Sequence, residues 1–238
     1  GWTEMGQGVD TVAVQVVCEE TGLKPGLFTV RTRTQDKTPA GMTTASRATS
    51  LVGNALIDAC KALKSDLKRE GLGALVGRRY RGRWVCDWST KPNAETHGKP
   101  VCTHYSYSYA TQVAVVDDAG RVSELIAAHD AGRVMNPMLF EGQIEGSLHM
   151  GLGYALSEEL VMENGRPKSL KLRDCGVLRA KDMPQLKVIA VEVRDPLGPY
   201  GAKGVGEIGL VPTAGAVANA LFAFDGLRRR TLPMKSKP

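Results

Sequence analysis

The sequence Gly-Gln-Ile-Glu-Gly at residues 142–146 lies within a stretch, 137–160, whose apolar spacing predicts a long helix. Glycines at 142, 146, 151 and 153 fall on or near one face of that helix. Glycine costs a helix about 1 kcal/mol relative to alanine, so these glycines indicate that something approaches closely. The neighbouring glycines leave space around the Gln143 carboxamide, which offers two donors and an acceptor. Such a group suits the edge of a heteroaromatic ligand.

Helices and strands are expected on both sides of this helix. Apolar spacing predicts further helices over 11–20, 46–67 and 212–224. Alternating patterns predict strands over 27–34, 105–116, 122–129 and 188–193, with turns at 38–41 and 117–120. Because strands and helices mix without strict alternation, the predicted fold class is α+β, with mixed strands and helices in two lobes.

The domain organisation is expected to follow composition. The stretch 71–100 is polar, basic and rich in turn formers, so it is predicted to be a linker or excursion between lobes 1–70 and 101–238. The chain begins with Gly and opens directly on a glycine motif, from which we expect a fragment or a split chain.

Composition narrows the class of protein. Hydrophobic residues make up 42% and charged residues 24% of the 238 residues, which is typical of a folded domain. The net charge of +6 would permit binding to nucleic acid, to a membrane surface or to an anionic ligand. Aromatics are only 5% and no recognition motif is present, so the basic runs 78–83 and 228–237 are interpreted as solvated surface or subunit contacts and nucleic-acid binding is not expected.

The cysteine pattern and hydropathy indicate the cellular setting. The five cysteines are odd in number and lack CxxC spacing, which argues against a disulfide framework and against an iron–sulfur or zinc site. No apolar run reaches the roughly 18 residues that a membrane helix needs, and no signal peptide pattern is present. A soluble, cytoplasmic protein without a membrane partner is expected.

The opening loop is glycine-dense. Gly6 and Gly8 flank Gln7 just before a predicted helix, where uncovered backbone N–H groups and the helix dipole would favour an anion or a polar cofactor edge. A tight turn that caps the helix explains the same residues equally well.

A hydroxyl cluster precedes the next long helix. Thr44, Ser46 and Arg47 lie in Gly-Met-Thr-Thr-Ala-Ser-Arg-Ala-Thr at 41–49. Ser46 would serve as an ordinary N-cap. Alternatively, the hydroxyls, the free helix N–H groups and Arg47 together bind a diphosphate.

Glu207 follows three glycines and Lys203, and an apolar helix comes after it. We expect its carboxylate at a loop–helix junction against apolar packing, where desolvation would raise its pKa toward the range useful for proton abstraction. The alternative is a first-turn glutamate that complements the helix dipole. The four histidines, His97, His104, His129 and His149, lack metal-ligand spacing and are interpreted as structural, so no protein-ligated metal is predicted.

Taken together, four segments resemble the molybdenum-binding subunit of the xanthine dehydrogenase and aldehyde oxidase family, closest to its bacterial selenium-dependent branch. Their order and spacing match over nearly the whole chain. The segments are the loop 1–8, the stretch 38–47 with Gly53-Asn54, the Gly-Gln-Ile-Glu-Gly helix, and Gly-Ala-Lys-Gly-Val-Gly-Glu at 201–207.

The resemblance implies a role for each segment. Gly6, Gln7 and Gly8 would hold the cofactor near molybdenum, and Gln143 would bind its pterin. Thr44, Ser46 and Arg47 would receive the phosphates of molybdopterin, as its cytosine dinucleotide or as molybdopterin itself. Glu207 would be the catalytic base, working beside molybdenum with a sulfido or selenido ligand. The pterin, not a side chain, would hold the metal.

The resemblance also implies what this chain lacks. The N-terminal half of the molybdenum subunit, the iron–sulfur domain and the FAD domain would lie elsewhere, so the chain alone should not turn over. A purine or other N-heterocycle is the expected substrate, as in purine catabolism. Many members read Gly-Glu-Pro-Pro where this chain has Gly-Glu-Ile-Gly at 206–209, which leaves the substrate open. The alternatives are an aldehyde-oxidising member and a non-catalytic module for molybdopterin binding or assembly.

Overall fold

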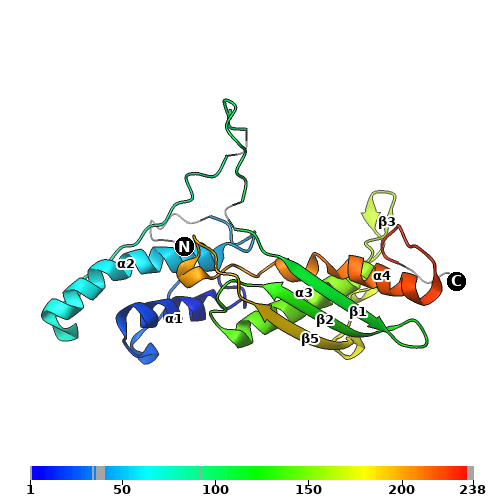
Figure 1. Cartoon of the computed structure of the whole chain (residues 1–238), viewed down its shortest axis with the longest axis horizontal. Coiled ribbons are helices and arrows are strands. Elements are labelled where there is room, and N and C mark those ends of the chain that lie inside the picture. The colour runs from blue at the N-terminus through cyan, green and yellow to red at the C-terminus, as the bar shows by residue number, and fades with distance from the viewer. Residues whose placement is uncertain (1, 34, 36–40, 92, 105, 235–238) are drawn as a thin grey trace. The chain divides into compact units, whose positions relative to one another are not determined.

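The computed structural model describes residues 2–33, 35, 41–91, 93–104 and 106–234 (Figure 1). The chain forms two compact units that are interleaved along the sequence. Unit 1 contains Gly1–Ser108, Ala131–Leu139 and Glu192–Gly204, and unit 2 contains Tyr109–Asp130, Phe140–Val191 and Val205–Pro238. The predicted lobes 1–70 and 101–238 stay a prediction, because whether those stretches fold separately is untested.

Unit 1 is built on a pair of packed helices, α1 (Val9–Thr21) and α2 (Ala48–Glu70). The helix α1 buries Val9, Ala13 and Val16. The α2 residue Gly53 is buried, and a Cβ there would stand 2.6 Å from Cγ of Pro199. The absence of that Cβ lets the 3₁₀ turn η5 (Pro199–Gly201) return against α2. Two further 3₁₀ turns are η1 (Pro25–Leu27) and η2 (Leu72–Leu75).

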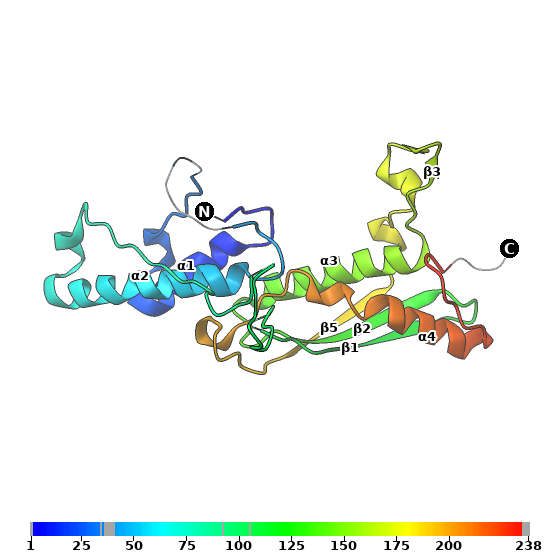
Figure 2. The ribbon, with the colours of Figure 1, turned by 90° about the horizontal axis from the view of Figure 1, so that it is seen from above.

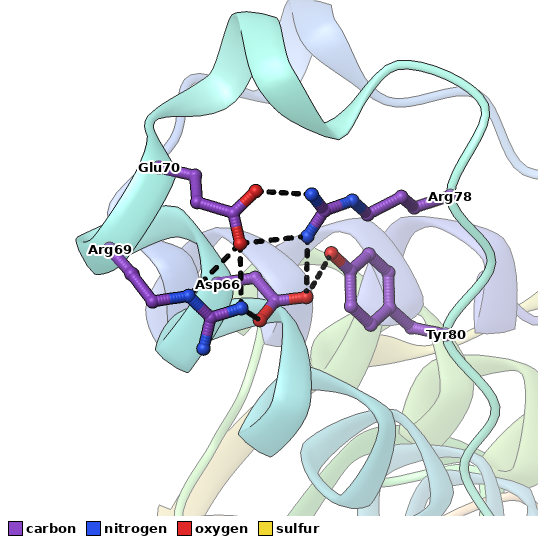
Figure 3. Close-up of polar contacts among 5 residues, drawn as sticks. All are labelled: Asp66, Arg69, Glu70, Arg78 and Tyr80. Atoms are coloured by element: carbon purple, nitrogen blue, oxygen red, sulfur yellow. Dashed lines mark hydrogen bonds and ion pairs between the residues drawn. The ribbon is translucent and has the colours of Figure 1, made fainter.

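The segment that follows η2 is tied to the end of α2 by charged and polar side chains (Figure 3). Arg78 binds the carboxylates of Glu70 and Asp66, and the Tyr80 hydroxyl donates to Asp66 over 2.9 Å. Arg69 pairs with the same two carboxylates. We call these five residues the α2 ion network. Beyond it, residues 76–104 have no helix or strand in the part that the structure describes.

Unit 2 contains a three-stranded sheet with strand order β1 (Ala110–Val116), β2 (Val122–Asp130), β5 (Gln185–Val191). The strands β1 and β2 form an antiparallel hairpin, and β5 runs parallel to β2 with Glu124 opposite Gln185. Along β2, the side chains of Leu125, Ala127 and His129 are all buried, as expected for alternate residues on one face.

Two helices complete the core of unit 2 and lie along the sheet (Figure 2). The helix α3 (Pro137–Leu156) buries Ile144, Leu148 and Leu152, and α4 (Thr213–Asp225), which packs on β1, buries Val217 and Leu221. Only Pro137, Met138 and Leu139 of α3 belong to unit 1. The small elements of unit 2 are a hairpin of β3 (Met162–Glu163) and β4 (Arg166–Pro167) and the 3₁₀ turns η3 (Leu172–Cys175), η4 (Ala180–Asp182) and η6 (Ile208–Leu210).

The predicted α+β class is confirmed, as are the four helices and the hairpin of 105–116 with 122–129, although β1 starts only at Ala110. The strand predicted over 27–34 is wrong for the described residues 27–33, because Leu27 ends η1 and residues 28–33 have no regular structure. Alternation alone cannot make a strand where no neighbouring strand offers backbone partners. Residues 34, 38–40 and 105 of these predictions lie outside the described residues.

Several element boundaries differ from the predicted ones, and that of α3 has a local reason. The helix α3 ends at Leu156 instead of residue 160, because the N–H groups of Ser157 and Glu158 both donate to the Gly153 carbonyl and turn the chain. The strand predicted over 188–193 is β5, which begins three residues earlier.

By length and composition alone, the stretch Ile208–Asp225 could cross a membrane. In the structure it consists of η6 followed by α4, and α4 packs on β1.

Candidate functional site

The opening loop of unit 1 is closed by its own carboxylate. Glu4 accepts the N–H groups of Gly6 over 2.7 Å and of Gly8 and Asp10 over 3.0 Å each. Partial burial raises the pKa of Glu4, but these backbone donors together outweigh that effect and leave the pKa below its usual range. The prediction that Gly6 and Gly8 leave uncovered N–H groups is therefore wrong, because Glu4 already occupies the anion position at the start of α1.

Gln7 also binds its own loop. Its Oε1 accepts the Met5 N–H over 2.6 Å, and its Nε2 donates to the Thr3 carbonyl over 2.8 Å. A carboxamide can make four hydrogen bonds, so one N–H and one oxygen lone pair stay available to a ligand. Gly6 has a φ of +100°, and a Cβ built there would meet nothing within 4 Å. The surface of the loop at Gly6 is thus open, and its backbone conformation favours glycine.

The loop before α2 is joined to the opening loop. The Thr43 hydroxyl accepts the Thr3 N–H over 3.1 Å, and the Arg47 guanidinium lies 5.4 Å from the centre of the Trp2 ring. Arg47 Nη2 donates to the Met42 carbonyl over 2.7 Å, and Arg47 Nε is buried without a hydrogen-bond partner in the described part of the chain. A buried donor of this kind usually has a partner, so Arg47 carries hydrogen-bonding capacity that a ligand oxygen could satisfy.

Ser46 is not the N-cap of α2, contrary to the first of the two interpretations. The N-cap is Arg47, which makes no side-chain capping bond, and Ser46 has a φ of 51°. A Cβ built on Gly204 would overlap the Ser46 carbonyl oxygen, so Gly204 lies directly on Ser46. Thr44 is exposed. The structure thus brings the opening loop and the 44–47 segment together within unit 1.

In unit 2, Gln143 occupies open space on α3. A Cβ built on Gly142 or Gly146 would meet nothing within 4 Å, and both glycines are exposed. The Gln143 carboxamide makes no hydrogen bond to any residue that the structure describes, whereas its carbonyl accepts the Ser147 hydroxyl over 2.8 Å. Gly151 and Gly153 differ, because a Cβ there would overlap Thr213 and Glu158. Only these two of the four α3 glycines are explained by packing within the chain.

Glu207 is exposed at the beginning of η6. The predicted apolar burial of its carboxylate is therefore wrong for this chain by itself. The alternative, a first-turn charge on a long helix, also fails, because the turn that follows is only three residues long and Glu207 makes no capping bond to it. Two residues later, a Cβ on Gly209 would stand 2.4 Å from Cβ of Ser147, one helical turn after Gln143. Glu207 and Gln143 thus belong to segments that pack directly on each other.

Sequence reasoning singled out neither Gln112 nor Thr213 near this contact, and it interpreted His129 as structural. Gln112 on β1 donates from Nε2 to the Gly209 carbonyl over 2.6 Å, and the same nitrogen lies 2.9 Å from His129 Nε2. The Thr213 hydroxyl donates to the same carbonyl over 3.3 Å. In the sequence, Gln112 is only a polar residue within an alternating strand, and this signal is too weak to assign a role. Among the described residues, no group of three or more His, Cys, Asp or Glu could hold a metal ion.

Comparison with known families identifies the family to which this chain belongs. A profile described as "Molybdopterin cofactor-binding domain" matches residues 1–77 and 73–184. The chain belongs to the molybdopterin cofactor-binding domain family. Within that family it is 28% identical over 271 residues to the "Xanthine dehydrogenase molybdenum-binding subunit" of Escherichia coli O157:H7, covering 100% of this chain and 36% of the relative.

Aldehyde oxidoreductases are equally similar. The protein of that name from Megalodesulfovibrio gigas is 29% identical over 98% of this chain and 27% of its own length. The solved structure of "Aldehyde Oxidoreductase from Desulfovibrio gigas" has a TM-score of 0.79 and 30% identity, covering 97% of this chain and 27% of that chain. Quinoline 2-oxidoreductase from Pseudomonas putida 86 shares the fold, with a TM-score of 0.75 at 21% identity.

The extent of these matches limits what they establish. The chain spans only 36% and 27% of the two curated relatives. Its membership in this molybdopterin family is established, whereas the activity of a whole relative is not thereby transferred. The side chains fit the cofactor in kind, because the unpartnered Arg47 donor suits phosphate oxygens and the unbound Gln143 carboxamide suits a pterin edge.

Proposed function

We propose that the chain is the cofactor-binding part of a molybdenum hydroxylase of the xanthine dehydrogenase type, which oxidises a purine or related N-heterocycle. One observation carries the proposal. Glu207 presents an exposed carboxylate two residues from Gly209, and Gly209 packs on the turn of α3 that follows Gln143. A titratable group and an unbound carboxamide are thus placed on two segments in contact within unit 2.

The proposed cofactor is molybdopterin or its cytosine dinucleotide with molybdenum, carrying a sulfido or selenido ligand. When bound, it supplies oxygen transfer to the substrate carbon and accepts two electrons. Gln143 would bind the pterin, and the exposed face of the loop Gly6-Gln7-Gly8 would contact the cofactor near the metal. Thr44, Ser46 and Arg47 would receive the phosphates, with the buried Arg47 Nε as one donor.

Glu207 is proposed as the general base. A positioned base contributes roughly 10²- to 10⁴-fold to a rate. Because Glu207 is exposed in this chain, desolvation of its carboxylate would have to come from substrate, cofactor and the remainder of the subunit. This requirement agrees with the proposal that the N-terminal half of the molybdenum subunit, together with iron–sulfur and flavin partners, is needed for turnover in the cytoplasm.

Molybdenum and nucleotide analysis tests the cofactor. The chain would be co-produced with the N-terminal half of a molybdenum subunit, purified, and analysed for molybdenum and for CMP released by acid. Molybdenum with CMP supports the dinucleotide form, and molybdenum without CMP supports molybdopterin itself. Absence of both would overturn the proposal. An Arg47→Met variant should retain less of either form, and Arg31→Met, which changes an arginine elsewhere in unit 1, is the control.

An aldehyde-oxidising enzyme is the second candidate, favoured by the 30% identity to the solved aldehyde oxidoreductase. Turnover assays with xanthine and with benzaldehyde separate the two.

A non-catalytic cofactor-binding or assembly module is the third candidate. If the chain is such a module, Glu207→Gln should bind molybdenum normally and should change the hydroxylation rate of the assembled enzyme by no more than a few-fold. That result would contradict a catalytic role for Glu207. Growth with and without selenium, followed by selenium analysis, tests the selenido ligand.

A further inference from the structure

The Gly209 carbonyl in unit 2 accepts two side-chain hydrogen bonds. Gln112 donates to it over 2.6 Å and Thr213 over 3.3 Å. On the other side, Gly209 is pressed against Ser147 and Ile144 of α3, where a Cβ would stand 2.4 Å and 3.4 Å away from their nearest atoms. The residue is therefore fixed from the sheet, from α4 and from α3. Only one residue separates it from Glu207.

Gln112 is in turn oriented by His129. Ala110 lies opposite His129 in the β1–β2 register, so Gln112 and His129 are diagonal neighbours on one face of the hairpin. Gln112 Nε2 has two hydrogens and lies within bonding distance of both the Gly209 carbonyl and His129 Nε2. Because the carbonyl must accept one of them, the other is available to His129, whose Nε2 then accepts and whose Nδ1 carries the proton.

The environment favours this arrangement. His129 is 0% exposed, and its burial lowers its pKa, so the neutral ring that can accept a hydrogen bond prevails at neutral pH. In the described part of the chain, His129 Nδ1 and Gln112 Oε1 are buried without partners. Burying two polar groups unsatisfied costs free energy. His129 shares the buried face of β2 with Leu125 and Ala127, so the pair is a buried polar contact next to an apolar row, and its geometry depends on the hydrogen bonds that it does make.

We propose that Gln112 and His129 are positioning residues that hold the Gly209 carbonyl, and through it the Glu207 loop, in register with the Gln143 turn of α3. The proposal rests on the proposed function of Glu207. It assigns no chemical step to either residue. Displacing a reacting group by about 1 Å can cost on the order of 100-fold in rate, so the expected effect is on turnover and not on substrate affinity.

The first experiment needs no cofactor. Backbone hydrogen exchange of residues 205–211 is measured in the full chain for wild type, Gln112→Met, and Thr111→Val, an exposed neighbour on the opposite face of β1, as control. Gln112→Met keeps the length of the side chain and removes its donor. Faster exchange over 205–211 in Gln112→Met, with exchange of β1 and β2 unchanged, is expected. Equal protection of 205–211 in all three proteins would overturn the proposal.

A second measurement keeps the proposal testable if Gln112→Met fails to fold. Nitrogen NMR of the wild-type chain identifies which imidazole nitrogen of His129 carries the proton. A neutral ring protonated at Nδ1 is expected. A ring protonated at Nε2 would overturn the proposal, because that nitrogen could not accept from Gln112.

Kinetics in the assembled enzyme separate this inference from the proposed function. With xanthine or benzaldehyde, whichever is turned over, Gln112→Met should lower kcat about 10- to 100-fold with little change in KM, while Thr111→Val has no effect. An unchanged kcat in Gln112→Met together with an inactive Glu207→Gln would refute the positioning role alone. An active Glu207→Gln would refute the proposed function itself.

Discussion

Two glycine-rich loops carry a glutamate each, and the structure uses the two glutamates in opposite ways. Glu4 turns inward and accepts three backbone N–H groups of its own loop. Glu207 is exposed, and its loop is held within unit 2 by the packing of Gly209 on Ser147. The contrast teaches that a glutamate in a glycine loop can close that loop as a structural group, as Glu4 does, or stay exposed, as does Glu207, which we propose as the base.

The largest expected effect is on turnover. Replacing Glu207 by Gln should lower the hydroxylation rate of the assembled enzyme by roughly 10²- to 10⁴-fold, because the general base is lost. Its melting temperature should stay the same, since the carboxylate is exposed. Glu4→Gln is the matched control, with normal or mildly reduced turnover and a lower melting temperature. The reverse pattern would show that the two roles have been exchanged.

The next effect distinguishes close packing from backbone conformation. Gly209→Ala places a Cβ 2.4 Å from Ser147, and overpacking of this kind costs roughly 1 to 3 kcal/mol. Gly6→Ala has open space but a φ of +100°, so about 1 kcal/mol is expected. Urea unfolding measures both variants. Gly215→Ala, within α4 and without any neighbour inside 4 Å, should be neutral or slightly stabilising.

Loss of the Glu4 carboxylate should have a smaller effect. Glu4→Ala removes a cap that is worth about 1 kcal/mol, less whatever solvent screening takes away at this half-exposed position. Because the folded pKa of Glu4 lies below its unfolded value, the contribution is complete above the unfolded pKa and is lost as pH falls through the folded one.

The pH dependence of unfolding tests this directly. The stability difference between wild type and Glu4→Ala should be constant near neutral pH and shrink below about pH 4, the ordinary range of a glutamate carboxyl. A difference that persisted unchanged at pH 2 would mean that the backbone contacts do not depend on the charge of Glu4.

The smallest effect is expected in the α2 ion network of Figure 3. Hydrogen bonds from Arg78 and Arg69 lower the pKa of Glu70 to about 2, but the pairs are at the surface, where solvent and salt weaken them. Glu70→Gln should therefore lower the melting temperature slightly in low salt and should not change it measurably at about 0.5 M salt. A large loss at high salt would show that the network holds the following segment by more than exposed charge.

Local sequence was enough to predict the helices and to place Gln143 on a helix and Glu207 in a loop, but it did not predict that the Glu207 carboxylate is exposed. Helical spacing gave α1, α2, α3 and α4 because a helix satisfies its own backbone within four residues. The alternating pattern did not predict the extent of β1 or the parallel pairing of β5 with β2, and it predicted a strand over 27–34 that does not form in the described residues 27–33. Those features depend on partners that are distant in sequence.

The sequence by itself placed Gln143 on a helix and Gln7 and Glu207 in glycine-rich loops, and it indicated which family these segments resemble. Only the tertiary structure decided that Glu4 closes its own loop, that Arg47 and not Ser46 begins α2, and that Gln112 reaches the Gly209 carbonyl. The physical reason is that a residue type limits which hydrogen bonds a side chain can make, while the contacts of the folded chain decide which of them it does make.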